Sequence, residues 1–170
     1  MPTSTPARRR GFTMLELLIV ISLVGLISLM AFGRTSAMMT QWRVTRASQA
    51  LAEELQSAFA IVGRDRRPVK ITINLHPDTM EVRITDRAGA VFYRRRSVGR
   101  TSAYMLNPAD FTNVYPVSRE LLVFPPGLAA DSLVWEINRE GKYRRVRMLR
   151  GGIVQVCSNR PVLNGVCTPA

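Results

Sequence analysis

The chain has 170 residues, which suits one domain and an appendage, and 46% of them are hydrophobic. Its 24 lysines and arginines stand against 12 acidic residues, and the net charge of +12 favours anionic partners: nucleic acid, anionic lipid or an acidic subunit. A basic surface that serves only solubility is the alternative. One histidine and two cysteines supply too few ligands for an ordinary zinc site, so we expect no metal and no cofactor.

The first eleven residues, MPTSTPARRRG, form a polar leader. This leader contains two prolines and ends in Arg8, Arg9, Arg10 and Gly11, so nothing in it can pack into a core. We therefore interpret it as a leader that is not part of the fold. The remaining chain would carry 21 cations and 12 acidic residues, a net charge of +9.

An apolar segment follows, and Glu16 is its one charged residue between Phe12 and Phe32. About 20 apolar residues span the hydrocarbon core of a membrane as a helix, so residues 12–33 are predicted to be a transmembrane helix. The arginines before it should stay cytoplasmic. A carboxylate inside such a segment costs roughly 2.5–3.5 kcal/mol on insertion scales, which indicates a function for Glu16. A charge that merely marks the helix start is the alternative.

The stretch GFTMLE at residues 11–16, followed by LLIVISLVGLI, resembles the leader of type IV prepilins and type II secretion pseudopilins. This resemblance implies that a prepilin peptidase cuts between Gly11 and Phe12, and that Phe12 is then N-methylated. It also implies that Glu16 pairs with the N-terminal amine of a neighbouring pilin or pseudopilin subunit. A buried charge is tolerable when another subunit supplies its partner.

The same resemblance implies a location. The chain would be a single-pass inner-membrane protein with a cytoplasmic N-terminus and a periplasmic head, and would then join a periplasmic pseudopilus or a surface pilus. An ordinary secretory signal peptide is the competing interpretation, with Ala31-Phe32-Gly33 as a loose cleavage site. The long apolar run, Glu16 within it, and the helical pattern beyond residue 33 argue against that alternative.

Helical periodicity continues over residues 34–63, which are predicted to form an amphipathic helix that enters the head. Apolar residues recur at spacings of three and four, namely Val44, Ala47, Leu51, Leu55, Ala58 and Val62. The opposite side is polar and carries Arg43, Arg46, Glu53, Glu54 and Gln56. Gly63 is expected to end the helix, which would run from about Thr13 to Val62.

From residue 64 to residue 170 we expect a head of antiparallel strands, because after Pro68 the apolar period changes to two. Strands are predicted at 69–75, 80–85, 90–94, 120–124, 133–138, 142–149 and 153–157. Turns are predicted at 76–78, 140–141 and 151–152, and a long loop at 97–119. The predicted fold class is α+β: a pilin-like long N-terminal helix packed on a small antiparallel sheet.

Two cysteines, Cys157 and Cys167, lie near the C-terminus. In an exported chain a close pair usually forms a disulfide, which would contribute about 3 kcal/mol of stability. Two free thiols are the alternative. The order of long helix, hairpins and C-terminal cysteine pair resembles the GspH/FimT group of minor pseudopilins.

The head offers no catalytic constellation, because its acidic residues are scattered and His76 lies beside a proline in a turn. No enzyme is therefore expected; the predicted function is that of a structural minor pseudopilin. The alternative is a pilus-displayed, DNA-binding minor pilin. Its candidate DNA-binding residues are Arg94, Arg95, Arg96, Arg145 and Arg147. FimT-like minor pilins are linked to DNA uptake through a C-terminal Gly-Arg-x-Arg motif, but Gly152-Ile153-Val154-Gln155 stands here and lacks both arginines.

Overall fold

The computed structural model describes residues 12–100, 102–115, 118–160 and 165–169, without the side chains of residues 31–34. The chain divides into two compact units, Met1–Met38 and Met39–Ala170. One helix, α1, runs from Met14 to Asp65 and belongs to both of them. The two units are described separately below, and the second is called the head. The predicted leader, with Arg8–Arg10 and Gly11, lies outside the described residues.

The helix ends three residues later than predicted. Gly63 does not stop it, and the ladder continues to Asp65. Arg66 then adopts a left-handed backbone with φ of 50°, and its N–H donates to the carbonyl of Val62 at 2.9 Å. This is the usual way for a helix to end, but glycine normally occupies the left-handed position.

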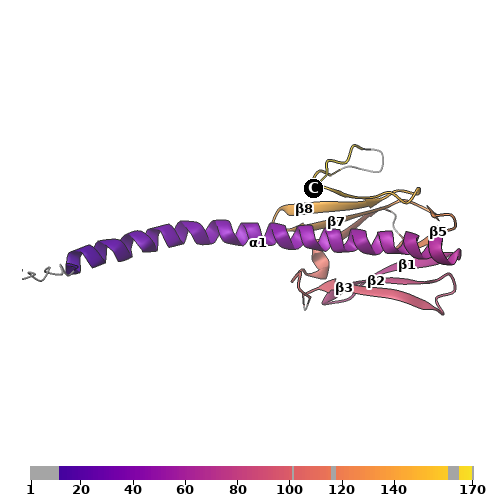
Figure 1. The fold of residues 1–170 in the computed structure, drawn as a ribbon, viewed down its shortest axis with the longest axis horizontal. Coiled ribbons are helices and arrows are strands. Elements are labelled where there is room, and N and C mark those ends of the chain that lie inside the picture. The colour runs from indigo at the N-terminus through magenta and orange to yellow at the C-terminus, as the bar shows by residue number, and fades with distance from the viewer. Residues whose placement is uncertain (1–11, 101, 116–117, 161–164, 170) are drawn as a thin grey trace, which may run out of the picture. The chain divides into compact units, whose positions relative to one another are not determined.

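In the head, one face of α1 is buried as the apolar spacing predicts. Leu51, Leu55 and Val62 are at most 1% exposed, and they belong to a single core cluster with strand residues. Figure 1 shows this half of the helix lying across the strands of the head. The predicted position of Glu54 was wrong: its side chain is fully buried and does not lie on a polar outer face.

The strands form two antiparallel sheets rather than one. The five-stranded sheet has the order β3-β2-β1-β5-β6. Its strands are β1 (Val69–Leu75), β2 (Thr79–Asp86), β3 (Phe92–Gly99), β5 (Glu120–Phe124) and β6 (Leu128–Ala129). The β1–β2 hairpin has the predicted turn at residues 76–78, and Val69 pairs with Asp86 at its open end. Both strands turn their alternate apolar residues toward the core.

The four-stranded sheet has the order β4-β7-β8-β9. Its strands are β4 (Phe111–Tyr115), β7 (Leu133–Arg139), β8 (Lys142–Met148) and β9 (Val154–Cys157). Glu140 and Gly141 form the two-residue turn between β7 and β8, with φ of 51° and 76°. Positive φ at both positions is what a tight hairpin with right-handed twist requires. The α+β class is confirmed: one long helix on antiparallel sheets.

Three strand predictions were wrong in detail. The stretch at 97–119 is not a long loop, since it holds the end of β3, a 3-10 helix at Pro108–Asp110 (η1) and the edge strand β4. The strand predicted at 90–94 is β3, which begins at Phe92 and continues to Gly99. The two-residue strand β6 was not predicted.

Candidate functional site

The apolar part of α1 in the first unit is exposed on all sides. Large side chains from Phe12 to Met30 are between 50% and 86% exposed, which no soluble helix of this length tolerates. Among the described residues, α1 is long and apolar enough to cross a membrane, judged by length and composition. The hydroxyls of Ser22 and Ser28 donate to the carbonyls of Leu18 and Val24, each at 2.8 Å. These two hydroxyls are thereby satisfied within the helix itself.

Glu16 lies in the first turn of α1, where a carboxylate interacts favourably with the positive end of the helix dipole. Its backbone N–H donates to the hydroxyl of Thr13 at 3.3 Å, so Thr13 caps the helix. The Glu16 side chain is exposed, and the described part of the chain gives it no ion pair. A carboxylate is thus presented at the side of an apolar helix, one turn after Phe12.

The candidate DNA-binding arginines of β3 face two different surfaces. Arg94 and Arg96 pair across the sheet with Ile84 and Val82, so they share the face that packs on α1. Arg94 Nε lies 2.9 Å from an oxygen of buried Glu54, and Arg96 Nε lies 3.5 Å from the other oxygen.

Burial raises the pKa of the Glu54 carboxyl, and the opposing effect of Arg94 and Arg96 is smaller. The folded head therefore binds a proton at Glu54 at a higher pH than the unfolded chain does. Stability linked to this group rises as the pH falls through the raised pKa toward the ordinary value of 4.5, and falls as the pH rises.

We expect this linkage to be visible in a Glu54→Gln variant. The wild type should gain stability relative to the variant as the pH is lowered from neutral to about 4.5, because only the wild type takes up this proton. The measurement is urea unfolding of both chains at a series of pH values. A difference in unfolding free energy that stays constant with pH would contradict the assignment. Asp78→Asn, at an exposed carboxylate in the β1–β2 turn, is the control.

Arg145 and Arg147 lie on the outer face of the four-stranded sheet, beneath the C-terminal segment. Arg145 Nε is 2.7 Å from Glu136, and Arg147 is only 6% exposed and donates to the carbonyl of Gly165 at 2.6 Å. Arg160 from the same segment stacks on Tyr143 at 4.3 Å.

The disulfide between Cys157 and Cys167 is present and closes this segment. All five candidate arginines thus have partners within the head. Arg95 differs in that it lies on the outer face of the five-stranded sheet, where it contacts Glu81. Their DNA-binding role stays a prediction.

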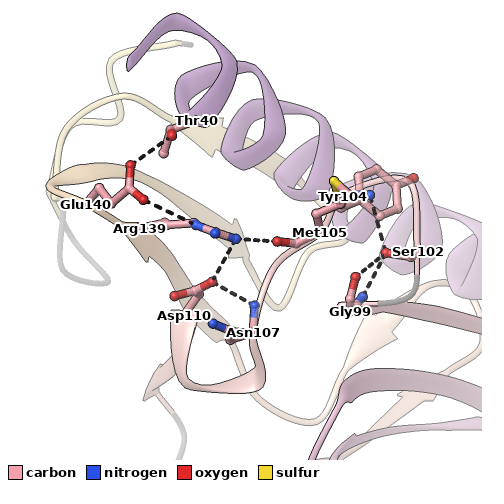
Figure 2. A network of polar contacts seen from close by, with 9 residues as sticks. All are labelled: Thr40, Gly99, Ser102, Tyr104, Met105, Asn107, Asp110, Arg139 and Glu140. Carbon is pink, nitrogen blue, oxygen red and sulfur yellow. Dashed lines mark hydrogen bonds and ion pairs between the residues drawn. The ribbon is translucent and has the colours of Figure 1, made fainter. Parts of the chain in front are cut away.

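A polar network fixes the segment between β3 and β4 (Figure 2). Arg139, at the end of β7, donates to the carbonyl of Met105 and lies 3.9 Å from Asp110. Asp110 in turn accepts from the N–H of Asn107 at 2.8 Å. Next in the chain, Glu140 accepts from the Thr40 hydroxyl of α1 at 2.9 Å. The network ties η1, the β7–β8 turn and the helix together.

Metal binding finds no support among the described residues, where no three His, Cys, Asp or Glu side chains cluster in reach of one ion.

His76, the one histidine, is half exposed in its turn and lies 3.9 Å from Glu81. Arg83 and then Arg95 hold the pKa of the Glu81 carboxyl below its ordinary value. Sequence reasoning missed this cluster, because its members come from two strands and a turn.

Comparison with known proteins bears on both units. Residues 6–32 match the family model described as the prokaryotic N-terminal methylation motif. The fold is similar to that of the type IV minor pilin FimU of Pseudomonas aeruginosa, with a TM-score of 0.53 and 18% sequence identity. That match covers 69% of this chain and 88% of the FimU chain. No curated protein sequence matches the chain significantly.

Proposed function

We propose that this chain, a type IV pilin-like protein by its methylation motif and its fold, is a minor pilin or pseudopilin of the GspH/FimT type. In this role it is a structural subunit and not an enzyme. A prepilin peptidase removes residues 1–11, Phe12 is methylated, and residues 12–33 hold the protein in the inner membrane until it joins a filament. The head, which follows this helix, stays on the periplasmic side.

One observation carries the proposal: from Met14 to Met30 the large apolar side chains of α1 are all exposed. Exposed side chains such as Leu15, Ile19 and Leu26 cost free energy in water, about 25 cal/mol for each Å² of apolar surface. Lipid covers this surface in the membrane, and the helices of other subunits cover it in a filament. Leu15, Leu18, Ile19, Ser22, Leu23 and Leu26 line a shallow groove along one side of the helix.

The carboxylate of Glu16 orients each subunit relative to its neighbour in the filament. A neighbouring subunit whose new N-terminus carries a positive amine gives Glu16 an opposite charge in an apolar surrounding. Pairing then removes a cost that a lone carboxylate bears there. This requires the cut to fall just before Phe12, so that the amine and the carboxylate lie one helical turn apart in every subunit.

The test is the N-terminal residue of the mature protein, determined by mass spectrometry after expression with a prepilin peptidase. We expect a chain that begins at methylated Phe12, and we expect Gly11→Ile to remain uncut because a bulky side chain then precedes the scissile bond. Gly25→Ala is the matched control, since a methyl group there meets no other atom within 4 Å. A mature chain that begins just after Gly33 would instead identify an ordinary signal peptide and overturn the proposal.

A further inference from the structure

Strand β3 is an edge of the five-stranded sheet. It is eight residues long, and among the described strands it pairs with β2 alone. An uncovered edge presents a row of backbone N–H and C=O groups to which another extended segment can bind. Proteins usually keep such edges short or cover them. A long open edge is therefore a candidate binding surface.

Two hydrogen bonds at the end of β3 show which of its backbone groups are open. The N–H of Arg100 donates at 3.0 Å to the carbonyl that precedes β2. The N–H of Gly99, one residue earlier, donates away from β2 to the hydroxyl of Ser102 at 2.9 Å (Figure 2). Backbone groups alternate in direction along an antiparallel strand. The N–H and C=O groups of Arg95 and Ser97 therefore point to the open edge, where the described part of the chain gives them no partner.

A groove lies beside this edge strand, on the face of the sheet that packs on α1. It has a volume of about 280 Å³ and is open to solvent. Its lining comes from α1, from β3 and from the segment after β3, namely Arg46, Gln49, Ala50, Glu53, Arg96, Ala103 and Tyr104. A strand added to β3 would point every second side chain to this face, because side chains alternate along a strand. These side chains would lie over the groove.

The groove contains a cation without a counter-charge. Arg96 is paired, since its guanidinium lies 3.1 Å from Glu53 and 3.5 Å from buried Glu54. Arg46 is exposed and has no ion pair with any described residue. Its guanidinium lies 5.5 Å from the centre of the Trp42 ring, a contact that holds the group but leaves its N–H donors available. A carboxylate above the groove would supply the missing partner of Arg46.

The charge of β3 determines which strand fits its edge. A second copy of β3 does not fit, because the run of Arg94, Arg95 and Arg96 would lie opposite the same run of the first copy. Like charges directly opposite each other on neighbouring strands are destabilising. An acidic strand has the opposite effect. On the outer face Arg95 already contacts Glu81, so the carboxylates of such a strand are needed on the groove side.

We propose that the open edge of β3 binds an extended acidic segment of another protein, which joins the five-stranded sheet as a further antiparallel strand. Its backbone bonds to Arg95 and Ser97, and its carboxylates face Arg46 in the groove. In this mode of recognition the main-chain hydrogen bonds give affinity and alternate side chains give specificity. This inference goes beyond the structural role of the chain and does not depend on it.

The test uses the full-length chain in a nonionic detergent and a labelled peptide of about eight residues in which threonine and glutamate alternate, followed by fluorescence anisotropy. All glutamates of such a strand lie on one face. We expect Arg46→Gln to lower peptide affinity at least about threefold, the range of an exposed ion pair. Lys142→Gln removes the same charge at the start of β8 and should leave binding nearly unchanged. Equal losses in these two variants would overturn the proposal.

Two N-methylated forms of the peptide separate strand pairing from attraction between charges. One carries a methyl group on the backbone nitrogen of every threonine, the other on that of every glutamate, and both keep all side chains. With the glutamates toward the groove, the residues opposite Arg95 and Ser97 are threonines, whose N–H groups point to β3. We expect N-methylation of the threonines to lower affinity about tenfold or more, and N-methylation of the glutamates to be tolerated. Equal affinity of the two forms would refute strand addition.

Amide hydrogen exchange locates the bound strand on the full-length chain. The N–H groups of Arg95 and Ser97 should exchange rapidly in the free protein and about tenfold more slowly with saturating peptide. The N–H groups of Arg94 and Arg96 already bond to β2 and should change little. Peptide-dependent protection on other strands, without protection of Arg95 and Ser97, would contradict the site.

Ser97→Pro blocks the edge from the side of the protein. It removes an N–H that points to the open edge and spares the ladder with β2, the position in a sheet where proline is tolerated. We expect Ser97→Pro to lower peptide affinity and Ser97→Ala to leave it unchanged. If Ser97→Pro does not show the wild-type unfolding transition, the two N-methylated peptides carry the test. Processing at Gly11 and Phe12 is measured separately, so either proposal can fail alone.

Discussion

Replacement of Glu16 by alanine is expected to abolish incorporation of the protein into a filament and to leave its membrane insertion and processing intact. Insertion should improve slightly, because a carboxylate in an apolar helix costs roughly 2.5–3.5 kcal/mol on insertion scales. Incorporation should fail because the neighbour's N-terminal amine would then be buried without a counter-charge. Breaking a buried ion pair by removing one partner costs about 3–5 kcal/mol.

The measurement compares the membrane fraction with sheared or crosslinked filaments in cells that express the other subunits. Glu16→Asp is the matched variant, since it keeps the charge on a shorter side chain and should retain part of the incorporation. Ser22→Ala is the control on the same helix, because that hydroxyl bonds only within its own turn. Normal incorporation of Glu16→Ala would refute the pairing role and leave the apolar helix alone as the basis of assembly.

Much of the architecture could be predicted because its determinants are local. Composition alone identifies the apolar run that contains Glu16. The spacing of apolar residues alone predicts the buried helix face with Leu51 and Leu55. The β1–β2 hairpin has strict alternation, so even its turn could be placed. In these segments propensity, patterning and tertiary packing agree.

The errors occur where contacts are distant in sequence. Glu54 was assigned to the polar side of the helix because its partner Arg94 comes 40 residues later and pairs through the sheet. A run of three arginines does not suggest a strand, yet alternation gives Arg94 and Arg96 to the helix side and leaves Arg95 outside. Strand β4 was missed since its five residues do not alternate cleanly and its pairing with β7 contains a register shift.

The same distinction limits what could be foreseen of the site. Gly11, Phe12 and Glu16 form a contiguous motif that sequence alone can recognise, although the first of them lies outside the described residues. The contacts of Glu81 with Arg83 and Arg95 could not be found this way, because Arg95 meets the other two residues only through the pairing of β2 with β3. Phe92 is exposed instead of Tyr93 because β3 contains a bulge, and no local sequence pattern predicts that bulge.

Leu55→Ala should have the largest effect on the stability of the head. Its side chain is fully buried in the cluster where α1 meets the strands, so truncation removes apolar contacts and leaves a cavity. We expect the free energy of unfolding to fall by about 2–5 kcal/mol. Gln56→Ala, at the exposed position beside it, should change stability by no more than about 0.5 kcal/mol. The fluorescence of fully buried Trp135 during urea unfolding reports both values.

A small domain has about 5–15 kcal/mol of stability in total, so a loss of this size leaves a sizeable unfolded fraction. In cells we therefore expect Leu55→Ala to be cut at Gly11 as usual but to accumulate poorly and to reach filaments in proportion to its amount. Glu16→Ala should show the reverse, a normal amount of stable protein and no incorporation. The two variants separate a folded head from a competent assembly helix, and identical behaviour would mean that the two functions are not separable in this chain.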